Sequence, residues 1–164
     1  MQNKALIVID IQNDITKNYK EIIDNINKVV DWAVGKNIYV VYIRHENLSA
    51  GTKNLKPNTY GSELAVDLKI ASENIFTKFK SNALTSEDFV KFINENEIND
   101  FYITGADATV CVKSTCFNMR KADYTVTVLS DCITSWDKKK IPEMIDYYKS
   151  RGCNVVSLDE LLKN

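Results

Sequence analysis

Histidine, glycine and proline are scarce in this chain, which has one histidine, five glycines and two prolines among its 164 residues. No stretch approaches the roughly 18 consecutive apolar residues that a membrane-spanning helix needs, and we find no internal repeat, low-complexity tract or linker. These absences argue against a transmembrane protein and against a repeat array. The length and the 45% hydrophobic content instead fit one folded domain over residues 1–164.

A strong excess of one charge is also missing. The net charge is −1, the isoelectric point is near 5.9, and the lysines are interleaved with acidic residues. These values give no electrostatic reason to expect a nucleic-acid or membrane partner. The N-terminal apolar run is too short for a signal peptide, and the four cysteines show neither CxxC spacing nor the density of a disulfide scaffold. We therefore expect a cytoplasmic protein with reduced thiols.

Short apolar runs rich in β-branched and aromatic residues alternate with amphipathic segments. The runs cover residues 5–9, 38–43, 74–79, 101–104, 124–129 and 154–158. Several are apolar at successive positions, a pattern typical of strands buried on both faces of a parallel sheet. The alternation predicts an α/β fold, a three-layer Rossmann-like parallel six-stranded sheet in the order 3-2-1-4-5-6 with helices on both faces.

The intervening segments carry helix signals. Apolar residues recur at helical spacing over residues 22–33. Thr85 and Asp88 form an approximate capping box before another such segment. Ser157 and Glu160 cap a short terminal helix. These helices supply the crossovers that a parallel sheet requires.

Three residues with reactive side chains follow three of the predicted strands. Asp10 follows the first strand, Lys78 ends the third, and Cys111 follows the fourth in the first turn of a helix. Ligands of open α/β sheets bind where the strand order reverses, so Asp10 and Cys111 should face each other. Taken singly, the three fit a turn residue, a solvated lysine and a buried cysteine. Together they suit nucleophilic catalysis, because the helix N-terminus favours thiolate, the carboxylate accepts the thiol proton and the ammonium holds the developing charge.

A glycine precedes the cysteine at a spacing that has a mechanical meaning. Gly105 lies six residues before Cys111 and lets the chain turn sharply off the strand. Backbone N–H groups of the turn and of Cys111 can then point into the same space. Such a pair would form an oxyanion hole for a tetrahedral intermediate, although this spacing alone is a weak signal.

Three ordered motifs carry a resemblance to a known superfamily. They are ALIVIDIQND at residues 5–14, TKFKSNAL at 77–84 and TGADATVCVKST at 104–115. In this order and at these separations, the chain resembles the isochorismatase-like cysteine hydrolases, which include nicotinamidases and N-carbamoylsarcosine amidases. The resemblance covers nearly the whole chain, since YIRHE, YGSEL and VLSDCITS match as well. It implies the same α/β fold, a small-molecule substrate, and assembly into a homodimer or homotetramer.

The resemblance also assigns roles to individual residues. It places an Asp–Lys–Cys triad on Asp10 as general base, Lys78 as electrostatic partner and Cys111 as nucleophile. It places the oxyanion hole on the backbone N–H groups of Asp107 and Cys111. It also implies a non-proline cis peptide bond between Ala106 and Asp107.

The chain departs from the family pattern at several positions. Nicotinamidases hold a metal with an aspartate and several histidines after the second strand, whereas His45 is the only histidine here. We therefore expect no metal and no other cofactor, and we interpret His45 as a structural hydrogen-bonding residue. Ile15 stands where the family often has phenylalanine, so one aromatic pocket wall is missing. The Asp107 side chain would repel anionic substrates if it faces the pocket.

Further pocket residues are candidates by position. Ile15, Tyr60 in the long polar connection over residues 46–62, and Trp136 after the fifth strand are expected to line the substrate pocket. Loops as long as this connection are usually functional or mobile, so it is a candidate lid. Packing within the chain or contact between subunits would explain Tyr60, Trp136 and the loop equally well.

These observations predict a metal-independent hydrolase that cleaves a C–N bond of a small amide, carbamoyl or imide-like compound through a thioester on Cys111. An isochorismate-type vinyl-ether hydrolase is an enzymatic alternative, and that reaction does not require the cysteine. A non-catalytic ligand-binding or scaffold protein would keep the fold without turnover. The complete triad argues against this last alternative.

Overall fold

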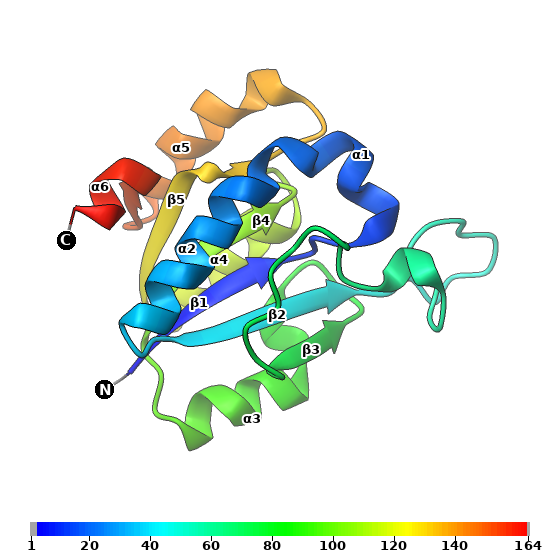
Figure 1. The fold of residues 1–164 in the computed structure, drawn as a ribbon, viewed down its shortest axis with the longest axis horizontal. Helices are drawn as coiled ribbons and strands as arrows, with labels where there is room; N and C mark the ends of the chain where they lie inside the picture. Colours follow the sequence, from blue (N-terminus) through cyan, green and yellow to red (C-terminus); the bar gives the residue numbers. More distant parts are fainter. Residues whose placement is uncertain (1–2, 164) are drawn as a thin grey trace.

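The computed structural model describes residues 3–163 and contains a six-stranded sheet with helices packed on both of its faces (Figure 1). The strand order is β3-β2-β1-β4-β5-β6, and every neighbouring pair is parallel. This confirms the predicted α/β class and strand order, and it places the reversal between β1 and β4. Met1, Gln2 and Asn164, at the ends of the predicted domain, lie outside the described residues.

The six strands correspond to the six apolar runs, with different ends. They are β1 (Lys4–Ile9), β2 (Tyr39–His45), β3 (Ile75–Lys78), β4 (Asp100–Ala106), β5 (Thr125–Thr134) and β6 (Asn154–Val156). The fifth strand is longer than the sequence predicts, because its pairing with β4 shifts register and then resumes with Gly105 opposite Ile133 and Ala106 opposite Thr134. This extension brings the end of β5 beside the turn that follows β4.

The helices form a layer on each face of the sheet. The α-helices are α1 (Thr16–Tyr19), α2 (Ile23–Gly35), α3 (Glu87–Glu95), α4 (Cys111–Lys121), α5 (Ile141–Ser150) and α6 (Leu158–Leu162). Short 3-10 turns lie at η1 (Asn13–Ile15), η2 (Lys20–Ile22), η3 (Tyr60–Ser62), η4 (Ala83–Thr85) and η5 (Lys138–Lys140). Buried residues of α3, α4 and α5 pack on one face of the sheet, and those of α2 and α6 pack on the other.

The central strand β1 shows why the runs are apolar at successive positions. Ala5, Ile7 and Ile9 are buried in the core under α3, α4 and α5. Leu6 and Val8 point to the opposite face and are buried in the core under α2 and α6. Each of these leucine, isoleucine and valine side chains contributes about 1.5–3 kcal/mol when it is fully buried. Both faces of β1 therefore stabilise the fold.

Two predicted helix caps have different outcomes. Ser157 and Glu160 form the capping box of α6, which confirms that prediction. The cap of α3 was predicted wrongly: Ser86, not Thr85, accepts the hydrogen bond from Phe89 N, at 3.3 Å. Thr85 instead ends η4, where its hydroxyl donates to Asn82 O. The preceding 3-10 turn therefore moves the start of the helix by one residue.

Gly105 has a different role from the predicted turn. It lies inside β4, with a φ of +122°, and a Cβ atom there would come within 2.2 Å of Ile9 O. Only glycine therefore allows β4 to approach β1 this closely. The prediction that the strand ends before this residue is wrong, since β4 continues to Ala106. The close approach brings Asp10, after β1, next to the turn that leads to α4.

The connection over residues 46–62 is held by hydrogen bonds to the start of the chain. Asp14 Oδ2 accepts from Leu55 N at 2.7 Å, and the buried Gln12 donates to Ser62 O at 2.8 Å. Gly61 packs on Asp14 so closely that a Cβ atom would lie 2.1 Å from its carboxylate. The role of the connection over residues 46–62 as a lid or as an interface stays a prediction. None of the helices within residues 3–163 combines the length and the apolar character of a membrane span.

Candidate active site

Four polar side chains from four elements meet at the carboxyl end of the sheet. Asp10 follows β1, His45 ends β2, Lys78 ends β3, and Cys111 begins α4. The structure thus brings together the three residues of the predicted triad and adds His45, which the sequence indicated only as a structural residue. His45 and Lys78 are register partners in the parallel pair of β2 and β3. Their side chains therefore leave the sheet on the same face.

The ammonium group of Lys78 is the centre of this cluster. Its Nζ atom lies 3.1 Å from Asp10 Oδ2, 3.3 Å from Cys111 Sγ and 2.9 Å from His45 Nδ1. A lysine ammonium has three N–H donors, so these three contacts can use all of them. The side chain of Lys78 is fully buried. The Lys78 ammonium is therefore held in one orientation.

Asp10 compensates the buried positive charge and keeps one oxygen available. Its side chain is 5% exposed and forms an ion pair with Lys78 through Oδ2. Within residues 3–163, its other oxygen, Oδ1, is buried without a hydrogen-bond partner. A carboxylate oxygen of Asp10, a ring nitrogen of His45 and Cys111 Sγ all lie within 4.8 Å of one another. The carboxylate is thus within reach of the thiol.

Burial and the nearby carboxylate keep the thiol of Cys111 protonated. Burial, followed by the negative charge of Asp10, raises the pKa of Cys111 to about 12, and the Lys78 ammonium opposes this shift. The helix N-terminus was expected to favour thiolate, but these two effects outweigh it. A thiolate on Cys111 would therefore form by transfer of its proton to a nearby base, and a carboxylate oxygen of Asp10 lies within 4.8 Å of Sγ.

The turn between β4 and α4 supplies backbone donors beside the thiol. Its first peptide bond, between Ala106 and Asp107, is cis. Ala108 N donates to Thr134 O at 2.8 Å, and Val110 N donates to Asp107 O at 3.0 Å. In the described part of the chain, no acceptor contacts the N–H of Asp107 or of Cys111. These two N–H groups are the ones that the family resemblance assigns to an oxyanion hole.

The Asp107 side chain is engaged by the protein itself. Oδ1 accepts from Thr109 N at 2.8 Å and from Thr109 Oγ1 at 2.9 Å, while Oδ2 accepts from Trp136 N at 2.9 Å and from Tyr19 OH at 3.0 Å. Burial opposes ionisation, but these hydrogen bonds outweigh it and lower the pKa of Asp107. The carboxylate therefore stays charged and fixes the turn. Its acceptor sites face protein donors.

Tyr19 on α1 is a site residue that sequence reasoning missed. Its hydroxyl donates to Asp107 Oδ2. Burial first, and then the charge of Asp107, raise the pKa of Tyr19, with smaller contributions from Cys111 and Asp10. Tyr19 therefore belongs to the hydrogen-bond network that holds the turn at Asp107. The contact spans 88 residues in sequence, and no motif or spacing pointed to it.

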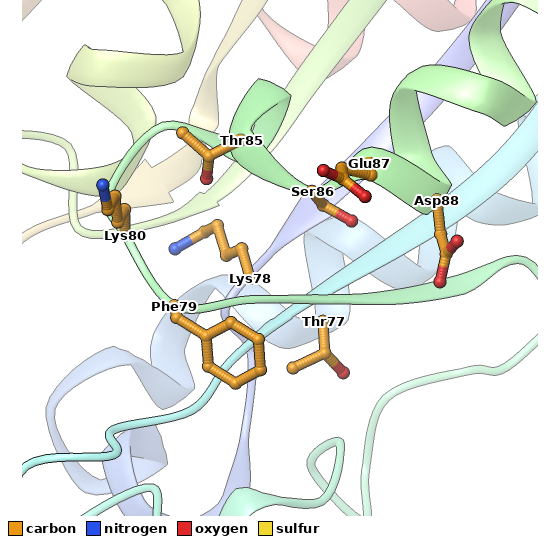
Figure 2. Close-up of a pocket in the computed structure, with 8 residues that line it drawn as sticks. All are labelled: Thr77, Lys78, Phe79, Lys80, Thr85, Ser86, Glu87 and Asp88. Carbon is orange, nitrogen blue, oxygen red and sulfur yellow. The ribbon is translucent and has the colours of Figure 1, made fainter.

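A cavity of about 390 Å³ adjoins the buried lysine. It is lined by Thr77, Lys78, Phe79, Lys80, Thr85, Ser86, Glu87 and Asp88. Figure 2 shows the ammonium of Lys78 pointing away from the Glu87 and Asp88 carboxylates at the start of α3. Phe79 is 53% exposed, so its ring lies at the surface of this cavity. The motif over residues 77–84 covers four of these residues, but the sequence assigns a role in the site only to Lys78.

The three predicted pocket residues lie around the site rather than in one wall. Trp136 is 70% exposed and lines a cavity of about 400 Å³ together with Asp107. Tyr60 is 66% exposed and borders a separate cavity of about 250 Å³ beside α1 and α2. Ile15 is half-buried at the end of η1, directly before the helix that carries Tyr19. Their contact with a substrate stays a prediction.

The donor set does not fit a metal ion. Asp10, His45 and Cys111 bring three ligand-type atoms together, but the Lys78 ammonium lies between them and contacts each one. A second cation would have to displace this buried charge. The ring nitrogen of His45 that faces the cluster is already hydrogen bonded to Lys78. We therefore assign no metal to this site.

Comparisons with known proteins agree with the fold. The sequence profile of the isochorismatase domain matches residues 4–160. A protein of Arabidopsis thaliana named a probable inactive nicotinamidase is 28% identical, over 79% of this chain and 80% of its own length. N-carbamoylsarcosine amidase from Thermoplasma acidophilum has a TM-score of 0.84 at 21% identity, covering 97% of this chain and 98% of its own. Pyrazinamidase of Pyrococcus horikoshii, solved in complex with zinc, has a TM-score of 0.82 at 24% identity, covering 94% and 99%.

Proposed function

The chain belongs to the isochorismatase family, and we propose that it is a cysteine hydrolase that cleaves a C–N bond of a small amide, carbamoyl or imide-like compound. One observation carries the proposal. A single buried ammonium, that of Lys78, contacts both a carboxylate and a thiol, at 3.1 and 3.3 Å. This arrangement supports a mechanism in which the carboxylate acts as the base and the protonated thiol as the nucleophile, with a fixed positive charge in contact with both.

In the first half of the reaction, Asp10 takes the Sγ proton and Cys111 Sγ forms a bond to the substrate carbonyl carbon. The carbonyl π electrons move to oxygen and give a tetrahedral oxyanion. When the carbonyl reforms, the C–N bond breaks. The leaving nitrogen receives the proton from Asp10, and ammonia or an amine departs. The product on the enzyme is a thioester, and Asp10 is again a carboxylate.

In the second half, water attacks the thioester carbon while Asp10 takes a proton from it. The second tetrahedral oxyanion collapses, and the C–S bond breaks. Asp10 then returns its proton to Cys111 Sγ, and the carboxylic acid leaves. Lys78 keeps its charge throughout and stabilises the carboxylate and the thiolate in turn. The balance is one water consumed and one amine released.

The backbone donors of the turn suit the charge that develops in both halves. The N–H groups of Asp107 and Cys111 have no acceptor among the described residues. Two such donors, fixed before the reaction, stabilise an oxyanion without reorganising, and removal of one donor in a comparable enzyme slows catalysis about 100- to 1,000-fold. Asp107 contributes here through its backbone, since its carboxylate binds Thr109, Tyr19 and Trp136.

A binding-only role is the alternative that one comparison favours, because the Arabidopsis relative is named probably inactive. A protein without turnover would gain nothing from a buried lysine held against a carboxylate and a thiol. Burial of these charges is costly, so the cluster is easier to explain by chemistry than by stability. We therefore prefer the enzymatic proposal.

Release of ammonia from a panel of amides, ureas and carbamoyl compounds tests the proposal. A substrate should be turned over by the wild type and by Cys116→Ala, a control on the same helix. Turnover by Cys111→Ala or Asp10→Asn should fall at least about 1,000-fold. A slow substrate should leave one acyl group on Cys111, visible by mass spectrometry. Full ammonia release by Cys111→Ala would contradict the thioester route, and turnover of a vinyl ether by Cys111→Ala, with no ammonia from any compound of the panel, would favour vinyl-ether hydrolysis.

A further inference from the structure

We infer that His45 is a positioning residue, which accepts the third N–H of Lys78 and so keeps the ammonium between Asp10 and Cys111. The inference rests on the proposed function, because it concerns the same ammonium. His45 does not touch the reacting atoms in that mechanism. It acts through Lys78, at 2.9 Å from Nζ.

The fold places the two side chains together without relying on a flexible loop. His45 and Lys78 are the last residues of β2 and β3 and are paired in register. The end of β2 is tied down by Gln12, whose amide accepts from His45 N at 2.8 Å and donates to His45 O at 2.9 Å. Gln12 itself is fully buried. The imidazole is therefore mounted on a fixed backbone.

A hydrogen bond on the far side of the ring selects its tautomer. His45 Nε2 lies 3.0 Å from Asn47 Oδ1. The Asn47 amide cannot be reversed without loss, because its Nδ2 donates to Asn54 O at 3.0 Å. An amide oxygen only accepts, so Nε2 carries the proton. Nδ1 then presents its lone pair to the Lys78 ammonium, which only donates.

The charges around the ring keep it neutral. Burial, followed by the positive charge of Lys78, lowers the pKa of His45. Asp10, Asn47 and the backbone of Lys80 act in the opposite direction and are the weaker influences. A neutral imidazole is an acceptor for the ammonium, whereas a protonated one would repel it. The orientation of Lys78 and the protonation state of His45 therefore support each other.

Loss of the His45 acceptor should lower the fraction of Cys111 that is present as thiolate. A buried ammonium with an unused N–H is unstable, so it would rotate away or release its proton. Lys78 is the group that lowers the pKa of Cys111 against burial and Asp10. The titratable groups around the thiol are Asp10, Lys78, His45 and Tyr19. Without a held Lys78, less thiolate would form at any given pH.

Alkylation of Cys111 by iodoacetamide between pH 7 and 10, followed by mass spectrometry of the intact chain and its peptides, tests this inference without a substrate. His45→Leu removes the acceptor and should slow alkylation at least about ten-fold at every pH, since the rate follows the thiolate fraction. His45→Asn keeps an oxygen near the position of Nδ1 and should stay within about three-fold of the wild type. Asn47→Leu frees the other tautomer and should slow alkylation by at least about three-fold.

Two comparisons make the result decisive. If His45→Leu and Asn47→Leu both follow the wild-type rate–pH profile, or if His45→Asn and His45→Leu slow equally, the positioning role is wrong. Should His45→Leu fail to fold by circular dichroism, His45→Asn and Asn47→Leu decide the question: the same rate in both overturns the inference. Failure of the proposed function looks different, because the acyl adduct on Cys111 would then be missing while these alkylation rates remain measurable.

Discussion

At the scale of single residues, Lys78 is the side chain whose substitution should lower the stability of the fold and the activity the most. Its ammonium is fully buried and is the partner of the Asp10 carboxylate, which is almost fully buried. Lys78→Met would leave that carboxylate without compensation, and breaking a buried pair in this way costs about 3–5 kcal/mol. We therefore predict that Lys78→Met lowers the free energy of unfolding by about this amount at pH 8, and that hydrolysis is lost as well.

Urea denaturation of the variant checks the stability part of this prediction. Lys80→Met is the matched control, since Lys80 lies two residues on in the same cavity wall and is exposed. It should change the free energy of unfolding by no more than about 0.5 kcal/mol. Equal free energies of unfolding for the two variants would mean that the Lys78–Asp10 ion pair does not contribute the predicted stability.

Gly105 allows a second prediction. A Cβ atom at this position would approach the backbone oxygen of Ile9 to 2.2 Å, and φ is +122°. Because backbone atoms of a central strand cannot move aside, Gly105→Ala should destabilise the protein by well over the roughly 1 kcal/mol of an ordinary substitution. Gly35→Ala is the control, since nothing lies within 4 Å of its Cβ position at the end of α2. Thermal unfolding should separate them, with Gly35→Ala at or above the wild type.

At the scale of elements, α1 is held by a residue from another part of the chain. Lys138, in η5, donates to Asn18 O at 2.6 Å and to Thr134 Oγ1 at 2.8 Å, and it forms an ion pair with Glu21. The same ammonium lies 5.5 Å from the ring centre of Tyr19. These contacts connect α1 to the end of β5.

Removal of this contact should loosen α1 while the sheet stays intact. Because the Lys138 side chain is half exposed, solvent screening limits its contribution to about 1 kcal/mol or less. Lys138→Met should therefore speed amide hydrogen exchange over residues 16–22 by up to about five-fold at low salt. Lys139→Met, one residue along the same turn, should leave exchange unchanged. An unaltered rate in Lys138→Met would mean that other contacts hold the helix.

The elements themselves follow from local patterns more than the site does. Apolar residues at successive positions predicted β1 and its neighbours. Successive side chains of a strand point to opposite faces of the sheet, so a strand that is buried on both faces needs apolar residues at successive positions. The extension of β5 to Thr134 was missed, because pairing there depends on a register shift opposite Gly105, which is a property of two strands. Motifs marked Asp10, Lys78 and Cys111, whereas Tyr19 reaches the site only through tertiary packing.

At the scale of the whole molecule, the single histidine gives the stability a distinct dependence on pH. Burial and Lys78 lower the pKa of His45 in the folded state below its unfolded value of about 6.5. The unfolded chain therefore binds the proton first as the pH falls. The stabilising contribution is complete above about pH 6.5 and is lost as the pH falls from there through the folded-state pKa.

Urea denaturation from pH 8 to pH 5 measures this effect. The free energy of unfolding of the wild type should fall by up to about 1.4 kcal/mol for each pH unit below 6.5, until His45 titrates in the folded state. His45→Asn should show a flatter dependence over the same range, because no other side chain in the sequence is a histidine. Parallel curves for the two proteins would show that the imidazole has the same proton affinity in both states.

Other properties of the whole protein remain predictions. A single domain, a small-molecule substrate, a homodimer or homotetramer, and a cytoplasmic location rest on composition or on the family resemblance. The prediction that His45 is a hydrogen-bonding residue is confirmed, but the sequence does not identify Lys78 as its partner. That partner depends on the pairing of β2 with β3, whose register brings residues 45 and 78 side by side.

The one imidazole also makes the site visible to spectroscopy. A proton spectrum of the unlabelled protein in heavy water contains a single histidine Hε1 resonance, so it needs no assignment. The ring touches Lys78, whose ammonium touches the nucleophile. Acylation of Cys111 removes an acceptor from that ammonium and should shift this resonance. One peak would then follow the formation and decay of the acyl-enzyme in real time.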